Sequence, residues 1–147
     1  MATLTPTLRL TSTDATSDTA FTFAVTDAIA IGPEIKGMSV IAIEANGGSD
    51  TVIKPAGSAG NHFLYVRHTG KQGDFSSTAT AAIVLKLGST SLSVLTPEEF
   101  IFMNVINSGV INAISSSSEK ISLEYAYFTK SYQVFKEIQI FTHCLTK

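Results

Sequence analysis

Apolar and polar residues alternate with a period of two along many short stretches of this chain. Phe21, Phe23 and Val25 are separated by single Thr and Ala residues, and a similar alternation runs from Ile121 to Phe128. Short runs rich in Val, Ile, Phe and Tyr and bounded by Gly, Asn and Ser are typical of β-strands. The pattern therefore predicts an all-β chain.

The clearest series of predicted strands lies between Asn61 and Val105. In its first strand, Leu64 and Val66 share a face with two histidines, while Phe63, Tyr65 and Arg67 share the other face. Three more strands are predicted at 83–87, 92–95 and 99–105. The run 38–45 has apolar residues on both faces, which is expected of a strand covered on both sides at the centre of a sheet. We predict an antiparallel β-sandwich, jelly-roll-like, with extended terminal arms.

The chain is long enough for one domain and is divided into three parts by its pattern. A chain of 147 residues buries on the order of 70% of its unfolded surface. Residues 1–18 are Thr-rich and predict an N-terminal arm or edge strand, where Pro6 is tolerated because an edge position needs no donor. Residues 19–129 form the predicted sandwich core. Residues 130–147 predict a C-terminal strand or arm.

Charge and composition exclude several classes of partner. A net charge of −2 and a pI near 5.9 give no clustered positive charge for nucleic acid. The apolar runs fall short of the ~20 residues of a membrane-spanning helix, and the first ten residues lack a secretion signal. The single cysteine, Cys144, cannot form an internal disulfide, which fits assembly in a reducing cytosol. We expect neither a nucleic acid nor a membrane as partner.

No group of residues has the spacing of an active site. His62 and His68 lie about 20 Å apart along an extended strand, so they cannot share one metal. Glu98 and Glu99 are adjacent on a predicted strand and point to opposite faces, which makes them a poor acid/base pair. The small-residue loop 54–60 lacks the spacing of a phosphate-binding loop. We therefore expect no catalytic residue, no metal and no cofactor.

Two segments are candidates for binding a partner. Phe75 lies in the polar stretch 69–81, where it either anchors a partner subunit or folds back under its own loop. The apolar C-terminal tail needs a place to be buried, either as a last strand of its own domain or as an arm on a neighbour. The candidate partner-binding residues of the tail are Tyr132, Phe135, Ile138 and Phe141.

Four stretches of the chain carry a resemblance: the opening MATLTPTLRLTSTDATSD, the strand HFLYVRHTG, the turn and strand LSVLTPEEFIFM, and the stretch ISLEYAYFTKS. They resemble small virion structural proteins of tailed bacteriophages, especially marine and cyanobacterial ones. The resemblance covers most of the chain up to Ser131. The chain departs from the pattern at Glu98, where Gly is usual, and at Asn104, near which Pro is common.

The resemblance implies a non-enzymatic virion component whose function depends on many copies of the chain acting together. The leading hypothesis is a capsid decoration (cement) protein that binds and stabilises the major capsid protein lattice as a small symmetric homo-oligomer, with a trimer favoured. It would be assembled in the host cytoplasm. The alternatives are a tail, neck or fibre-associated adaptor, or a host- or carbohydrate-binding β-sandwich module. The last alternative requires an exposed cluster of tyrosines.

Overall fold

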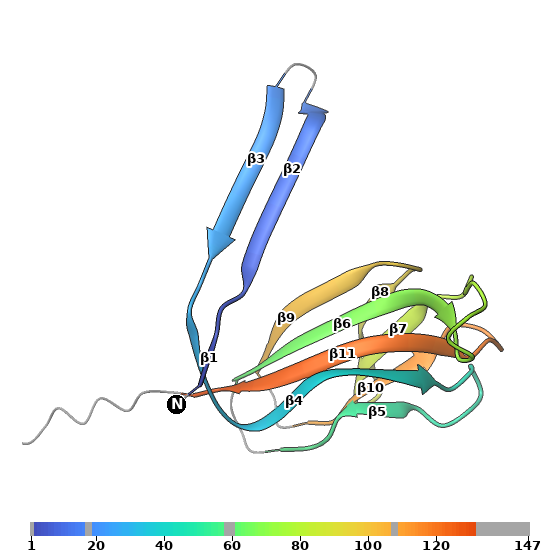
Figure 1. Ribbon diagram of the computed structural model, residues 1–147. Helices are drawn as coiled ribbons and strands as arrows, with labels where there is room; N and C mark the ends of the chain where they lie inside the picture. Colours follow the sequence, from blue (N-terminus) through green and yellow to red (C-terminus); the bar gives the residue numbers. More distant parts are fainter. Residues whose placement is uncertain (1, 17–18, 58–60, 107–108, 132–147) are drawn as a thin grey trace, which may run out of the picture. The chain divides into compact units, whose positions relative to one another are not determined.

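A computed structural model describes residues 2–16, 19–57, 61–106 and 109–131 (Figure 1). These residues form strands and connecting loops, with no helix among them, so the predicted all-β class is confirmed. The strands are β1 (Ala2–Leu4), β2 (Thr7–Thr16), β3 (Thr19–Thr26), β4 (Ile29–Ile43), β5 (Thr51–Lys54), β6 (Asn61–Gln72), β7 (Ile83–Leu87), β8 (Thr90–Leu95), β9 (Phe100–Ile106), β10 (Ile111–Ser115) and β11 (Ile121–Lys130).

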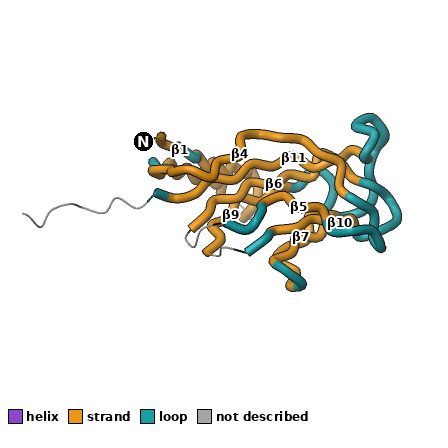
Figure 2. Tube along the Cα trace, turned by 90° about the horizontal axis from the view of Figure 1, so that it is seen from below, coloured by secondary structure: helices purple, strands orange, loops and turns teal. Residues whose placement is uncertain are grey.

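Two sheets account for nine of the strands and form the predicted sandwich. The larger sheet has the order β1-β4-β11-β6-β9 and the smaller one the order β5-β10-β7-β8. Neighbours along β4-β11-β6-β9 and along the smaller sheet are antiparallel. The strands of the two layers can be followed in Figure 2. Among the described strands of these two sheets, β7 and β8 are the one pair of neighbours that also follow each other in the chain. The other paired strands are distant in the sequence.

One layer of aliphatic side chains fills the space between the sheets. In β6, Leu64 and Val66 point inward and are fully buried, as their alternation predicts. They meet Ile83 and Leu85 of β7 within one cluster of buried residues. The other fully buried apolar members of that cluster are Ile43, Ile53, Ile111, Ala113, Ile121 and Leu123. This layer is the core of the domain.

The prediction that the run 38–45 is covered on both faces is wrong for the described chain. Ile41 and Ile43 face the core, but Val40, on the opposite face of β4, is 51% exposed. A two-layer sandwich covers only the inner face of each strand. The second apolar face of β4 therefore lies on the outside of the larger sheet.

The remaining two strands, β2 and β3, pair with each other as a separate antiparallel hairpin. The chain falls into two compact units, one of Met1–Ala30 with Ser131–Lys147 and one of Ile31–Lys130, and the second unit contains the sandwich strands except for β1 and the first two residues of β4. The domain boundary that we expected after residue 18 would separate the two strands of this hairpin, because β2 ends at Thr16 and β3 begins at Thr19. The apolar run 19–26 finds its hydrogen-bonding partner in the Thr-rich strand before it and not in the sandwich sheets.

Both sandwich histidines are buried and serve as hydrogen-bonding side chains. His68 Nε2 donates to the carbonyl oxygen of Ala81 at 2.9 Å, while its Nδ1 accepts from the Gly70 N–H at 3.0 Å. His62 Nδ1 lies 3.1 Å from the Thr129 hydroxyl. A buried polar group costs free energy unless it is hydrogen-bonded. These contacts explain how two histidines fit on the inner face of β6.

The turn between β8 and β9 holds a glutamate where glycine is the easier residue. Pro97 begins the turn, Glu98 has a φ of 71°, and the Glu99 N–H closes it by donating to the Thr96 carbonyl at 3.1 Å. Pro followed by a residue of positive φ is the pattern of a type II turn. The turn therefore holds the backbone of a non-glycine residue, Glu98, in a strained conformation.

We predict that Glu98→Gly raises the free energy of unfolding by about 0.5–1 kcal/mol relative to Glu98→Ala. A left-handed conformation costs a non-glycine residue about 1–2 kcal/mol, and part of the relief is offset by the entropy of Gly in the unfolded chain. Both variants lose the carboxylate, so their difference isolates the backbone term. Equal urea midpoints and slopes for the two variants would contradict this account of the turn.

Candidate interaction surfaces

The outer face of the larger sheet carries a row of aromatic rings from β6 and β9. Phe63 stacks on Phe102 with ring centroids 5.8 Å apart and planes at 8°, and Tyr65 meets Phe100 at 6.4 Å. Phe100 is 61% exposed, and Phe102 is also exposed. We call Phe63, Tyr65, Phe100 and Phe102 the aromatic face. The alternating partners on β9, Ile101 and Met103, pack against the core, so both faces of this strand are apolar.

Residues on the neighbouring strands β11 and β4 extend the aromatic face with apolar side chains and with the carboxylate of Glu124. Phe128 of β11 lies directly opposite Phe63, and the exposed Val40 of β4 lies opposite Glu124. The Tyr65 hydroxyl donates to Glu124 Oε1 at 3.1 Å. Partial burial, and then the hydrogen bond and charge of Glu124, raise the pKa of Tyr65 above its usual value. Tyr65 therefore stays a neutral donor at physiological pH.

The outer face of the smaller sheet is apolar as well. Val52 of β5 and Leu92 and Val94 of β8 are exposed on this face. Close to them, Lys86 Nζ pairs with Asp50 Oδ1 at 3.0 Å. Both side chains are partly buried, and a pair near the surface contributes little to stability, typically about 0–1 kcal/mol. The sandwich thus presents apolar side chains on both of its outer faces.

The β2–β3 hairpin is amphipathic. Its register places Leu8 opposite Val25 and Leu10 opposite Phe23, and these four side chains are between 42% and 50% exposed. We call them the hairpin's apolar face. The alternate cross-strand pairs are Thr7 with Thr26, Arg9 with Ala24, and Thr11 with Thr22. Side chains alternate across a strand, so this second set forms the polar side of the hairpin.

The loop after β6 displays Phe75 and does not fold it inward. Phe75 is 54% exposed and has a φ of 62°, which is strained for a bulky residue. The Asp74 carboxylate accepts hydrogen bonds from the N–H groups of Ser76 and Ser77 and from the Ser77 hydroxyl. The Gly73 N–H is tied to the Lys120 carbonyl at 2.8 Å. These hydrogen bonds hold the loop in place. A role for Phe75 as a partner anchor stays a prediction.

The predicted tail residues Tyr132, Phe135, Ile138 and Phe141 lie outside the described residues, as does Cys144. Whether the tail is a strand or an arm therefore stays a prediction. The three tyrosines that the structure describes do not together form the exposed cluster that a carbohydrate site requires. Tyr125 is buried and Tyr127 packs against the core, whereas Tyr65 lies on the opposite face of the sheet.

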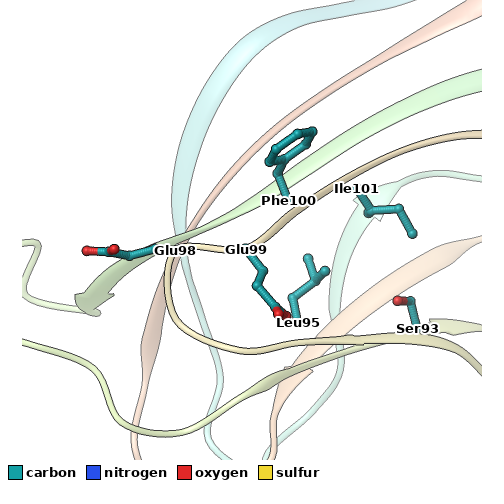
Figure 3. A pocket seen from close by; sticks show the side chains of 6 residues that line it. All are labelled: Ser93, Leu95, Glu98, Glu99, Phe100 and Ile101. Atoms are coloured by element: carbon teal, nitrogen blue, oxygen red, sulfur yellow. The ribbon is translucent and has the colours of Figure 1, made fainter. Parts of the chain in front are cut away.

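Figure 3 shows an open depression lined by Ser93, Leu95, Glu98, Glu99, Phe100 and Ile101. Glu98 points away from Glu99, whose side chain lies toward Leu95. Glu99 Oε2 accepts from the Thr96 N–H at 2.8 Å, and hydrogen bonding by the Thr96 backbone and hydroxyl lowers the pKa of this carboxyl. The two carboxylates thus stabilise and flank a turn and do not face one substrate.

Among the residues that the structure describes, no group of three or more His, Cys, Asp and Glu side chains could hold a metal ion. The same residues include no helix long and apolar enough to cross a membrane. No known protein family and no curated protein sequence matches the chain.

Two of these surfaces were not recognised from the sequence, although the signal is there. The segment FIFMNV has apolar residues at both parities, which in a two-layer fold leaves Phe100 and Phe102 outside. The hairpin was missed because its two strands were assigned to different parts of the chain. Leu8 and Leu10 can be recognised as part of an apolar face only when the pairing that places them opposite Val25 and Phe23 is known.

We predict that Asp74→Asn flattens the dependence of stability on pH. Hydrogen bonds from Ser77 and Ser76 hold the pKa of Asp74 well below its usual value. A carboxyl with a depressed folded-state pKa contributes stability that is complete above its unfolded pKa, near 4, and is lost as the pH falls through the folded pKa. The wild type should therefore lose more stability than the variant between pH 7 and pH 2.5.

Melting temperatures at several pH values measure this effect. Ser77→Ala, which removes only the 2.6 Å hydroxyl contact, should give an intermediate slope. Identical slopes for the wild type and Asp74→Asn would mean that the Asp74 network does not stabilise the folded loop.

Proposed function

We propose that this chain is a non-enzymatic virion structural protein, foremost a capsid decoration protein that in many copies binds and stabilises the major capsid protein lattice. The observation that carries the proposal is the exposure of apolar side chains on both outer faces of one small sandwich. Phe100 and Phe102 lie on one face, and Val52 and Val94 on the other. A cement protein needs two such surfaces, because it contacts its own copies and the lattice at the same time.

The energetics suit assembly in many copies. Full burial of a Phe or Val side chain is worth about 1.5–3 kcal/mol, so a patch of two or three side chains gives a weak single contact. Copies that are linked into one oligomer engage a lattice together, and the combined binding exceeds that of each copy without new contacts. Exposed apolar patches of this kind are otherwise uncommon on soluble monomers.

The sequence resemblance supports the same class. The stretch HFLYVRHTG corresponds to β6, LSVLTPEEFIFM to β8 and β9, and ISLEYAYFTKS to β11 with Ser131. These segments supply both the core layer and the aromatic face. The same resemblance fits a tail, neck or fibre-associated adaptor, which is our second candidate. The two candidates differ in copy number per particle.

Co-production with the major capsid protein encoded in the same viral genome tests the proposal. Particles would be purified by sedimentation, and the amount of this chain would be measured against the capsid protein. A decoration protein is expected at a fixed ratio to the capsid subunits, in many copies. A few copies per complete virion would instead identify an adaptor, and absence from both particles and virions would refute the virion assignment.

We predict that charges placed on the two outer faces cause different losses. Phe100→Asp should weaken self-association, whereas Val94→Asp should weaken particle binding and leave the oligomer intact, each by at least tenfold, because burial of an unpaired carboxylate is costly. Thr90→Asp, at an exposed position of β8, is the matched control. Light scattering and cosedimentation read the two losses separately. Wild-type behaviour of both variants would contradict the use of these faces.

A further inference from the structure

The strand β9 lies at an edge of the larger sheet and carries none of the features that keep such an edge from pairing. Within the described residues its single strand neighbour is β6 (Figure 1). An edge strand presents unpaired N–H and C=O groups, and natural sheets guard them with short strands, bulges, proline or charged side chains. The seven residues of β9, FIFMNVI, include no charge and no proline. The pairing of β9 with β6 runs without a register shift.

The other described edges of the sandwich carry such guards. β1 has three residues and β5 has four. The ladder of β5 with β10 passes over Ile53, and the ladder of β8 with β7 passes over Leu92, so both of these edge strands are bulged. The contrast singles out β9 among the described edges as the place where a further strand can join the sandwich.

The hydrogen-bond pattern shows which backbone groups of β9 face the open edge. The His68 N–H donates to the Glu99 carbonyl at 2.9 Å, so position 99 turns its hydrogen-bonding groups toward β6. Residues of an antiparallel pair alternate between hydrogen-bonded and non-hydrogen-bonded positions. The N–H and C=O groups of Phe100, Phe102 and Asn104 therefore point away from β6. A joining strand would bind these groups.

The two faces of β9 define the chemistry of the joining strand. One face carries Ile101 and Met103, which pack against the core, and the other carries Phe100 and Phe102 of the aromatic face. An uncharged strand with apolar side chains at both parities continues both faces. β9 itself has this composition, and it has no charge that would repel its own copy.

We propose that β9 pairs antiparallel with β9 of a second copy of this chain, so that the two larger sheets join into one. This inference rests on the self-association in the proposed function and names the contact that produces it. Addition of a strand to an exposed sheet edge is a recurring mode of recognition between chains. The aromatic faces of the two copies would then form one continuous outer face.

A twofold axis at Met103, the middle residue of β9, pairs the whole strand with its copy. Phe102 of each copy then lies opposite Asn104 of the other copy. The outward-facing backbone groups of the two strands meet in about six to eight hydrogen bonds. Glu98 and Glu99 precede β9 and lie outside the paired length, so their like charges stay apart.

This contact closes after two copies. The same strand is used on both sides of a twofold contact, so the pairing leaves no β9 edge free for a third copy. The inference therefore specifies a dimer. The outer face of the smaller sheet takes no part in this contact and remains available for the lattice contact of the proposed function.

Opposite charges placed on β9 test the pairing. Phe102→Lys with Asn104→Lys makes one edge positive, and Phe102→Glu with Asn104→Glu makes it negative. Like charges directly opposite each other destabilise a strand pair, so each variant alone should raise the dimer dissociation constant at least tenfold. A mixture of the two should form a dimer of one copy of each. Leu92→Lys with Val94→Lys, at exposed positions of β8, is the matched control and should leave the dimer intact.

Analytical ultracentrifugation measures these equilibria, and circular dichroism checks that each variant is folded. The substitution of Phe102 also removes its stack on Phe63, but recovery of the dimer in the mixture cannot come from unfolded protein. Wild-type dimers of both charged variants would overturn the inference. A mixture of folded variants that stays monomeric would overturn it as well.

A single cysteine on the proposed axis tests the register. The full chain would carry Met103→Cys, with Cys144→Ala to remove the native thiol. Opposite residues at a non-hydrogen-bonded position have Cα atoms about 4.5 Å apart, which a disulfide can span. Oxidation is expected to give a covalent dimer on a denaturing gel, whereas Leu92→Cys in the same background should run as a monomer. A dimeric sample without the bond at position 103 would overturn the inference.

The outcomes separate this inference from the proposed function. A wild-type trimer would overturn the edge pairing and leave self-association standing, and so would a monomer that still coats particles in many copies. If residues 132–147 or another virion protein occupy the edge, the bond at position 103 will not form between copies, which overturns the inference alone. If the wild type is a monomer and does not join virions, both proposals fail.

Discussion

The shared layer of aliphatic side chains between the two sheets is the interaction on which the rest of this structure depends. Leu64 and Val66 reach it from β6, and Ile83 and Leu85 reach it from β7, which follows β6 in the chain but belongs to the other sheet. Because side chains alternate across a strand, fixing these residues inward also fixes Phe63 and Tyr65 outward. The aromatic face is therefore a direct consequence of how the core is packed.

The polar contacts at the ends of the strands hold this arrangement in register. His68 bridges the Ala81 carbonyl and the Gly70 N–H, and Glu119 accepts hydrogen bonds from the N–H groups of Thr80 and Ala81. Desolvation acts to raise the pKa of Glu119, but these hydrogen bonds outweigh it and lower the pKa overall. The sandwich thus keeps its loops tied to its core while its outer faces stay apolar.

The sequence predicted the features that depend on local alternation and missed those that depend on partners far along the chain. The two faces of β6 follow from period two alone, and the structure confirms them. The hairpin could not be assigned from residues 1–18, because its second strand begins at Thr19. The exposure of Val40 was also missed, since an apolar residue on the second face of a strand indicates cover without saying that the cover comes from the same chain.

The conformation of the turn between β8 and β9 was also beyond prediction from the sequence. The sequence of Pro97 and Glu98 predicts a turn, but the positive φ of Glu98 is imposed by the pairing of β8 and β9 with their neighbours and not by its own preference. For the candidate surfaces, Phe75 was singled out from its place in a polar loop, and its role as a partner anchor stays a prediction. The aromatic face required knowledge of which side of β9 the core occupies.

The central claim is that apolar outer faces make this chain a unit of a closed assembly. The most direct test is the solution mass of the full-length protein, measured by light scattering at concentrations spanning two to three orders of magnitude. The account predicts a single closed oligomer whose mass is constant over the upper part of this range, with dissociation only on dilution. A monomer at every concentration would contradict it.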